Sequence, residues 1–471
     1  MSLADDRRNS VRLTDTAASE LEALLGDRFT TAVGIRRQHA ETGMTYHTSV
    51  PPEGVAFPES TEEVAEIVKI CARHKVPIIA YGAGSSLEGH FQAIEGGITV
   101  DLAGMNEVLE VNAEDLDCTV QPGVTRKQLN EYLRDTGLFF PIDPGADASL
   151  GGMTATRASG TNAVRYGTMR ENVLSLTVVL ADGRVIKTAR RARKSSAGYD
   201  LTRLFVGSEG TLGIITEVTL RLYGIPEAIS AAVCPFQSME GAVNTVIETI
   251  QMGIPVARIE LVDDVTMDCV IQYSQLTQYK PEPMLFFEFH GTPAGVEEQA
   301  TMVGEIAASN GGGEFQWTAN AEERNRLWQA RHDVNWAMGL LKETPEETML
   351  ATDVCVPISR LADCIMQTKQ DLDETGLRSG IVGHVGDGNF HMGLVADFND
   401  PEQKKRAVDF SDRLTERALA MGGTCTGEHG VGIGKIKFLQ AEHGEALSVM
   451  RDLKRALDPD NIMNPGKMIR V

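Results

Sequence analysis

The sequence predicts an α+β protein with more than one domain. Before about residue 226, short apolar runs typical of strands alternate with helical segments, and glycine-rich loops join them. After residue 227, glycine becomes less frequent and the helical segments lengthen around strand-like runs, which indicates a sheet covered on one side by helices. A chain of 471 residues is also too long for one ordinary core, so at least two domains are expected.

Caps and apolar runs define the individual elements. Ser60 followed by Glu63 is a capping-box pattern, so a helix is expected from Ser60 to about His74. A shorter polar helix is expected within residues 1–30, with its leucines on one face. By the same reading, further helices are expected over 125–136, 239–253 and 293–311. Strands are expected over 75–81, 97–102, 118–124, 139–143, 259–262 and 284–290.

The stretch GHVGDGNFHMG, residues 383–393, predicts a hairpin rather than a helix. Each of its glycines would cost roughly 1 kcal/mol in a helix interior, and Asp387-Gly388 between two apolar runs is the strongest short hairpin signal. A two-residue turn there places His384 opposite His391, with Cβ atoms roughly 5 Å apart on one face. Such a pair is typical of a metal site, although a single histidine in a strand more often packs without a ligand.

Composition excludes several classes of protein. The net charge of −22 argues against a nucleic-acid partner and against a basic patch for anionic membranes. No apolar run approaches the roughly 20 residues that span a bilayer, and no secretory signal is visible at the N-terminus. The seven cysteines include no CxxC pair, so neither a disulfide framework nor a cysteine-ligated iron–sulfur cluster is expected. A cytoplasmic location fits these features best.

Three glycine-rich loops stand out in the first half, at residues 81–90, 144–167 and 207–218. The first is not a dinucleotide fingerprint, because Leu87 stands where the third glycine is required. It still exposes consecutive N–H groups that suit an anion, and a structural turn is an equal alternative. Small and hydroxylated residues in all three loops permit close backbone approach. Together they indicate an extended ligand such as a dinucleotide.

These loops, in this order, resemble the flavin domain of the vanillyl-alcohol-oxidase (PCMH-type) superfamily. The second half resembles its branch of D-lactate dehydrogenases, D-2-hydroxyglutarate dehydrogenases and glycolate oxidase D-subunits. The residues that carry this likeness are 383–391 (GHVGDGNFH), 424–432 (TCTGEHGVG) and 458–468 (DPDNIMNPGKM). Segments 327–332 and 352–359 are most similar to the cytochrome-type D-lactate dehydrogenases. The resemblance covers roughly residues 45–471.

The resemblance implies a domain organisation. It implies an N-terminal helical segment over 1–46 and a two-subdomain FAD-binding domain over 47–226. It further implies a substrate and metal-binding cap domain over 227–440, built on an antiparallel sheet covered by helices, and a C-terminal segment over 441–471 that returns to the FAD domain.

FAD is the cofactor that the resemblance implies. Some members attach the flavin covalently through a histidine in the first glycine loop, but that loop reads GAGSS here, so noncovalent FAD is expected. His90 lies nearby at another position, and its role is open. The implied FAD-binding residues are Tyr81, Gly82, Ala83, Gly84, Ser85, Ser86, Gly89, Pro144, Gly145, Ala146, Ser149, Gly152, Met153, Thr156, Ser159, Gly160, Asn162, Glu209, Gly213, Ile215 and Asn464.

The resemblance also supplies a third metal ligand. It implies that His384, His391 and Glu428 bind a divalent cation, zinc or manganese, in a site with open positions. The alternative role for Glu428 is to accept backbone N–H bonds. His429 is the expected general base, because an imidazole with a pKa near neutrality can take the hydroxyl proton of a 2-hydroxy acid. The alternative is that His429 orients Glu428.

Two further residues have expected roles at the substrate. Arg331 is the candidate clamp for the substrate carboxylate, because a guanidinium binds a carboxylate through two parallel hydrogen bonds. Asn389 is expected to bond the substrate or to set a histidine tautomer. Asp353 suits either task and is left unassigned. No second obvious arginine accompanies Arg331, which mildly favours a monocarboxylate substrate.

The expected function is oxidation of a D-2-hydroxy acid to the 2-oxo acid, with hydride transfer to the flavin N5. A quinone, a cytochrome or a flavoprotein is the expected electron acceptor, and a peripheral position at the inner membrane is compatible with this. Oligomeric state is left open, a homodimer included. The alternative function is a metal-dependent hydrolase that uses His384, His391 and Glu428 on a phosphorylated substrate.

Overall fold

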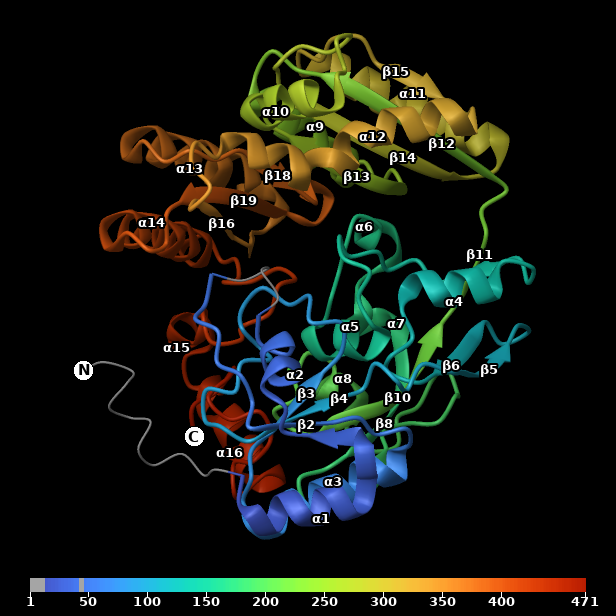
Figure 1. The fold of residues 1–471 in the computed structure, drawn as a ribbon. Coiled ribbons are helices and arrows are strands. Elements are labelled where there is room, and N and C mark those ends of the chain that lie inside the picture. Colours follow the sequence, from blue (N-terminus) through green and yellow to red (C-terminus); the bar gives the residue numbers. More distant parts are fainter. Residues whose placement is uncertain (1–12, 42–45) are drawn as a thin grey trace. The chain divides into compact units, whose positions relative to one another are not determined.

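The computed structural model describes residues 13–41 and 46–471, and it divides into two compact units (Figure 1). The first comprises Met1–Ser159, Gly167–Ile225 and Glu428–Val471. The second comprises Gly160–Tyr166 and Pro226–Gly427. The second unit thus ends at Gly427 rather than at 440, and it takes in a short piece of the second glycine-rich loop.

The first unit contains two larger sheets, as a two-subdomain arrangement requires. One sheet has the order β1-β2-β4-β3, in which β1 and β2 are antiparallel while the pairs β2–β4 and β4–β3 are parallel. The other has the order β5-β6-β10-β8-β9 and is antiparallel. A short pair joins β7 to β11. The strands are β1 (Phe29–Thr30), β2 (Gly54–Ala56), β3 (Ile78–Tyr81), β4 (Ile98–Asp101), β5 (Val108–Asn112), β6 (Asp117–Val120), β7 (Leu138–Phe139), β8 (Val173–Val179), β9 (Val185–Lys187), β10 (Ile214–Arg221) and β11 (Tyr223–Gly224).

Several helices of the first unit begin at a residue whose side chain caps them. Ser60 Oγ accepts a hydrogen bond from the backbone N–H of Glu63, but the Glu63 carboxylate bonds Arg28 and the N–H of Glu59, so only half of the capping box forms. The apolar faces of α1 and α3 pack on the strands of the first sheet. The α-helices are α1 (Asp15–Leu25), α2 (Val33–Gln38), α3 (Thr61–His74), α4 (Arg126–Leu133), α5 (Leu150–Thr156), α7 (Met169–Asn172), α8 (Leu201–Phe205), α15 (Leu439–His443) and α16 (Ala446–Leu457).

The second unit is built on an eight-stranded antiparallel sheet of order β15-β12-β14-β13-β18-β19-β16, with β17 paired to β19. The expected antiparallel sheet is therefore confirmed. Its strands are β12 (Ala228–Pro235), β13 (Val256–Val262), β14 (Met284–Gly291), β15 (Gln316–Thr318), β16 (Thr348–Ala351), β17 (Val354–Cys355), β18 (Ile381–Gly383) and β19 (Asn389–Ala396).

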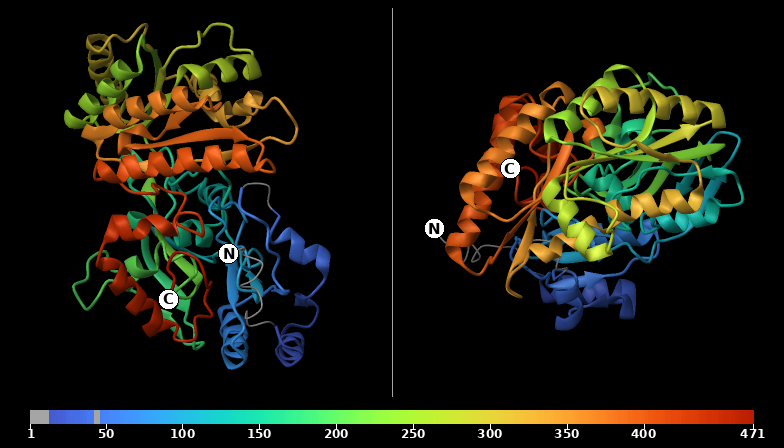
Figure 2. Two further views of the ribbon diagram at one scale, coloured as in Figure 1. Left: turned by 90° about the vertical axis from the view of Figure 1, so that its left-hand side faces the viewer. Right: turned by 90° about the horizontal axis from the view of Figure 1, so that it is seen from above.

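Helices cover both faces of this sheet, so the expectation of one covered face is wrong. Met284 and Phe286 pack with residues of α10 and α12 in one apolar cluster. Position 291 faces the opposite side of the sheet, where a Cβ on Gly291 would lie 3.9 Å from Cγ1 of Val296 on α11. Helix α14, orange-red in Figure 2, packs alongside β19. The α-helices are α6 (Ala163–Tyr166), α9 (Met239–Gln251), α10 (Asp264–Ser274), α11 (Pro293–Ser309), α12 (Ala321–Ala337), α13 (Leu361–Thr375) and α14 (Pro401–Ala420). On β14, Leu285, Phe287 and Phe289 on one face and Met284 and Phe286 on the other are all buried, as a sheet covered on both faces requires.

The predicted two-residue turn at Asp387-Gly388 is also wrong. Strand β18 ends at Gly383 and β19 begins at Asn389, and a 3-10 turn over Val385–Asp387 joins them. In the ladder His391 pairs with Val382, and His384 lies outside it. A type I′ turn needs positive φ at both central residues, whereas only Gly388 has it here, at 78°. The two imidazoles nevertheless come together, with ring centroids 5.4 Å apart.

Candidate active site

A buried carboxylate, Glu260, joins two of the predicted site residues. Glu260 lies on β13 and is fully buried; its Oε1 lies 2.7 Å from Nδ1 of His384. Its Oε2 accepts from Nε and Nη2 of Arg331, on α12, at 3.0 and 2.7 Å. Burial by itself would raise the pKa of Glu260, but the charges of His384 and Arg331 hold it below the ordinary value. Glu260 is therefore ionised, and Nδ1 of His384 carries the hydrogen.

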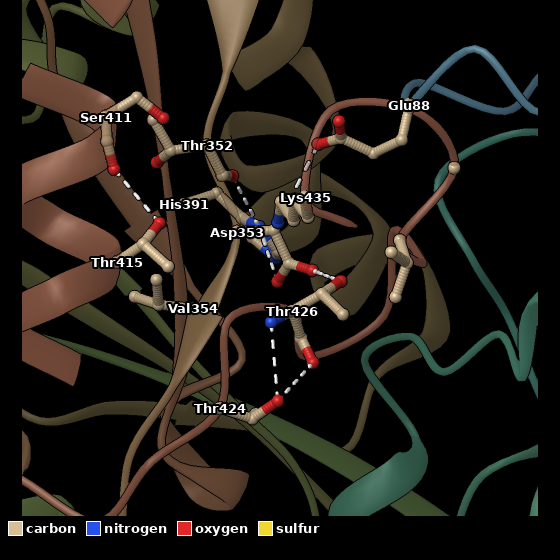
Figure 3. Close-up of polar contacts among 12 residues, drawn as sticks. Glu88, Thr352, Asp353, Val354, His391, Ser411, Thr415, Thr424, Thr426 and Lys435 are labelled. Atoms are coloured by element: carbon tan, nitrogen blue, oxygen red, sulfur yellow. Dashed lines mark hydrogen bonds and ion pairs between the residues drawn. The ribbon is translucent and has the colours of Figure 1, made fainter. Parts of the chain in front are cut away.

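His391 is oriented by a second set of contacts. Its Nδ1 lies 3.2 Å from the carbonyl oxygen of Thr352 and 3.6 Å from Oδ1 of Asp353 (Figure 3). A carbonyl oxygen can only accept, so Nδ1 is again the protonated nitrogen and Nε2 carries the lone pair. Both histidines thus have the tautomer that a metal ligand requires, each with an oxygen behind it.

The expected third ligand lies beside this pair. One ligand atom from each of His384, His391 and Glu428 lies within 4.8 Å of the others. Glu428 follows Gly427, the last residue of the second unit, in the chain. A Cβ on Gly427 would lie 2.2 Å from Nδ2 of Asn389 and 3.0 Å from Oδ1 of Asp353. Two imidazoles and a carboxylate at this spacing suit a divalent cation such as zinc or manganese.

Asp353, which the sequence left unassigned, ties the loop before Glu428 to the sheet. Its Oδ2 accepts from Oγ1 of Thr426 at 2.7 Å (Figure 3). Its Oδ1 accepts from Nδ2 of Asn389 at 2.8 Å. Nδ2 of Asn389 also donates to the carbonyl of Val354. The amide nitrogen of Asn389, an expected catalytic residue, is therefore engaged in holding Asp353 and strand β17.

Sequence reasoning missed Glu260 and Arg258, which lie on the same strand and face. Arg258 donates from Nε to Oδ1 of Asn162 at 3.0 Å, and its guanidinium lies 5.2 Å from the ring centroid of Trp328. Trp328 and Arg331 are three residues apart on α12, so β13 and α12 meet through two pairs of side chains. Charged residues alternating within a buried apolar strand were the signal in the sequence that could have identified them.

A pocket within the first unit includes some of the expected flavin residues. Six of them line it: Tyr81, Gly82, Ser149, Gly152, Gly213 and Ile215. The pocket also includes residues that the sequence reasoning missed, namely Ala80, Leu102, Pro122, Gly151, Ala155 and Gly210. Gly160 and Asn162 instead belong to the second unit.

The pocket fits a ligand that approaches the backbone closely. A Cβ on Gly82 would meet Oγ of Ser149 at 2.3 Å, and a Cβ on Gly151 would meet Cβ of Pro122 at 2.4 Å. Oγ of Ser149 is buried and has no hydrogen-bond partner within residues 13–41 and 46–471. Such a hydroxyl is suited to a polar ligand group, so the pocket is compatible with part of FAD.

The remaining expected flavin residues do not line this pocket: Ala83, Gly84, Ser85, Ser86, Gly89, Pro144, Gly145, Ala146, Met153, Thr156, Ser159, Glu209 and Asn464. Nδ2 of Asn464 donates to the carbonyl oxygens of His90 and Glu209. The loops around residues 90, 209 and 464 are thereby tied together within the first unit. In the described ranges, no helix combines the length and the apolar character that a membrane crossing requires.

Two known families match most of the chain. The family described as "FAD binding domain" matches residues 52–189, and the family described as "FAD linked oxidases, C-terminal domain" matches residues 225–468. The fold is also that of p-cresol methylhydroxylase with substrate bound, with a TM-score of 0.79 at 19% identity, covering 97% of each chain.

Several relatives are similar over most of their length. The chain is 51% identical to a probable mitochondrial D-lactate dehydrogenase of Danio rerio, covering 97% of this chain and 92% of that protein. It is 47% identical to a mitochondrial D-lactate dehydrogenase [cytochrome] of Arabidopsis thaliana, covering 96% and 79%. It is 34% identical to glycolate oxidase subunit GlcD of Bacillus subtilis, covering 88% and 89%. The chain therefore belongs to the FAD-linked oxidases with a PCMH-type FAD-binding fold, as an oxidoreductase of the D-lactate dehydrogenase group.

Proposed function

We propose that this chain oxidises a D-2-hydroxy acid of the D-lactate class to the 2-oxo acid, with noncovalent FAD and a divalent cation, zinc or manganese. The supporting observation is the histidine pair whose Nδ1 atoms face Glu260 and Thr352, beside Glu428. Nε2 of His384, Nε2 of His391 and a Glu428 oxygen are the proposed cation ligands. The sequence similarity to D-lactate dehydrogenases supports the substrate class.

The chain's own residues then have defined tasks. Arg331 binds the substrate carboxylate, while its bonds to Glu260 keep the guanidinium on the sheet side of α12. His429 accepts the hydroxyl proton as the carbon–hydrogen bond breaks. Asn389 keeps Asp353 and the loop before Glu428 in place. When bound, the cation polarises the hydroxyl oxygen and FAD accepts the hydride at N5.

A cation, a base and a carboxylate clamp around the reacting carbon would leave one side for the departing hydride, so a single enantiomer should react. The similarity to D-lactate dehydrogenases favours the D form. A monocarboxylate is the favoured class, as expected from the sequence.

The electron acceptor and the location are part of the same proposal. The bracketed word in the name of the Arabidopsis thaliana relative is "cytochrome", which favours a cytochrome over a quinone or a flavoprotein as the acceptor. The two plant and fish relatives are named mitochondrial, so the cytoplasmic location expected here is not confirmed. The hydrolase alternative loses its support, because the chain belongs to a family of oxidoreductases.

The test is anaerobic mixing of the FAD-loaded protein with D-lactate or L-lactate, followed by the visible absorbance of the flavin. D-lactate should bleach the flavin in one turnover, and an artificial electron acceptor should then sustain pyruvate formation. The proposed function is rejected if neither enantiomer reduces the flavin. The proposed selectivity for the D form is rejected if L-lactate reduces the flavin as fast as D-lactate does.

A further inference from the structure

The loop from Glu428 to Lys435 lies against two buried acidic residues of the first unit. Glu209 follows α8 in the third glycine-rich loop, and Glu88 lies in the first. Glu209 is 5% exposed and Glu88 is 3% exposed. Burial of a carboxylate is costly unless hydrogen bonds or charges compensate it, so each needs partners.

Glu209 receives its partners from the loop backbone. Oε1 accepts from the N–H of Val431 at 2.6 Å, and Oε2 accepts from the N–H of Gly432 at 2.9 Å. One carboxylate thus binds two consecutive backbone donors, just after Glu428 and His429. Glu209 adopts this place with φ at 53°, a left-handed conformation that a non-glycine residue rarely holds without a reason.

His90 supplies the opposite charge. Its Nε2 lies 3.2 Å from Oε2 of Glu209, and the residue is 7% exposed. Burial lowers the pKa of His90, but the charge of Glu209 outweighs this, and the net direction is upward. His90 therefore faces a carboxylate, which gives it a role other than attachment of the flavin.

Glu88 holds the next residues of the loop. Its backbone oxygen accepts from the N–H of Ile433 at 2.9 Å, and its Oε1 lies 3.7 Å from Nζ of Lys435. Burial would raise the pKa of Glu88, but the charges of Lys435, His47 and His429 hold it below the ordinary value. Glu88 thus keeps its charge beside the loop.

The glycines of the loop allow this close fit. A Cβ on Gly430 would lie 2.7 Å from Nε2 of His90 and 2.8 Å from Oε1 of Glu209. A Cβ on Gly432 would lie 2.0 Å from the backbone oxygen of Glu88. Both glycines also have positive φ, at 81° and 48°. The loop is therefore shaped to the two acidic residues along its length.

We infer that Glu209, with His90 as its counter-charge and Glu88 as a second support, is a positioning residue that holds Glu428 and His429 in place. This rests on the proposed function for the roles of Glu428 and His429. Gly210 and Gly213, in the same loop as Glu209, line the pocket of the first unit. The Glu209 carboxylate itself binds the loop that follows Glu428 and His429.

The experiment compares Glu209→Gln with Glu217→Gln in the full-length, FAD-loaded protein. Glu217 is a matched control, because it is a part-buried glutamate of β10 whose carboxylate bonds Thr177 and not the loop. Gly432→Ala is a second variant that displaces the loop while both carboxylates remain. Flavin absorbance and a thermal melt report whether each variant is folded.

Three measurements are made on each variant. Hydrogen exchange of a peptide spanning 428–434 should be at least about tenfold faster in Glu209→Gln and Gly432→Ala, because the hydrogen bonds from the N–H groups of Val431 and Gly432 to residue 209 are weakened. Mn²⁺ affinity should fall by about tenfold or more, the typical effect of losing a charge-assisted bond behind a ligand. At saturating Mn²⁺, kcat with D-lactate should remain at least about tenfold lower than in wild type. KM should change by less than about threefold, because the proposed carboxylate clamp, Arg331, is unaltered in both variants.

The outcomes separate this inference from the proposed function. Exchange, Mn²⁺ affinity and kcat that match the Glu217→Gln control would overturn the positioning role. Loss of FAD from Glu209→Gln with normal exchange of 428–434 would also overturn it, since Glu209 would then be a flavin ligand. If wild-type protein binds no Mn²⁺ or Zn²⁺ but exchange accelerates in both loop variants, the positioning of the loop stands and the metal part of the proposed function fails.

Discussion

Glu260 on β13 and His384, the residue after β18, are 124 positions apart in the chain, and Oε1 of Glu260 lies 2.7 Å from Nδ1 of His384. The same carboxylate binds Arg331, so one buried charge orients both a proposed cation ligand and the proposed carboxylate clamp. In the proposed function, this shared residue links cation binding to substrate binding.

Glu260→Gln should therefore weaken both functions. The amide holds His384 less firmly and leaves Arg331 without its counter-charge. Cation affinity should drop by about 10–100-fold, and the free energy of unfolding should fall by about 3 kcal/mol because a buried pair is broken. Metal titration and denaturant unfolding measure the two effects. An affinity equal to that of wild type would mean that Glu260 does not orient His384.

Removal of any cation ligand should give one phenotype. His384→Ala, His391→Ala and Glu428→Gln should retain FAD but hold little metal and turn over slowly, because the remaining pair of ligands binds an ion poorly. Their effects should be strongly non-additive when combined. Metal content per flavin and kcat are the measurements, with His443→Ala as a control on a histidine of α15.

His429→Ala should differ from the ligand variants. It should keep the metal and the flavin and lose most turnover, by roughly 10²–10⁴-fold for loss of a general base. Full metal occupancy in the three ligand variants would instead show that the histidine pair has another purpose.

Arg331→Lys should impair use of the substrate. A lysine keeps the charge, but its single nitrogen cannot hydrogen-bond Glu260 and, at the same time, bind the substrate carboxylate through two parallel hydrogen bonds. KM should rise, and kcat/KM should fall by about 2 kcal/mol of transition-state stabilisation, with FAD content unchanged. Steady-state kinetics with D-lactate measure both constants. Values of KM and kcat/KM near those of wild type would show that Arg331 does not bind the substrate carboxylate.

Asp263 should make the stability depend on pH. This buried residue caps α10 through Thr266, and burial raises its pKa to about 6. Because the folded protein retains the proton to higher pH than the unfolded chain, the contribution of Asp263 to stability is fully present below about pH 4. This contribution is lost as the pH rises to about 6, by about 3 kcal/mol. Asp263→Asn keeps the cap without the charge.

The comparison is urea unfolding of wild type and Asp263→Asn between pH 4 and pH 8. The variant should gain roughly 2–3 kcal/mol over wild type by pH 7 and little at pH 4. The difference between the two proteins cancels the other titrating groups. A difference that stays constant with pH would show that Asp263 ionises as freely when folded as when unfolded.

FAD should be released on denaturation. Nε2 of His90 lies 3.2 Å from Oε2 of Glu209, and the GAGSS stretch at residues 82–86 contains no histidine. After acid precipitation the flavin should remain in the supernatant. Flavin in the washed pellet would implicate His90 in a covalent bond.

The sequence by itself determined the glycine-rich loops, the strands and helices with clear caps, and the residue types His384, His391 and Glu428 that the structure brings together. These features are local, because a turn, a cap or a short apolar run depends on neighbouring residues. The hairpin register was not determined, since an Asp-Gly pair also fits a 3-10 turn that ends in one left-handed glycine.

Only the tertiary structure decided which side chains stand behind the site. Glu260 reaches His384 across a separation of 124 residues, and Glu209 reaches Val431 across 222. No local pattern encodes such pairs, because their energy arises only when the sheet and the loops are packed and water is excluded from the charges. Helices on both faces of the second sheet, and the role of His90 beside Glu209, follow from the same packing.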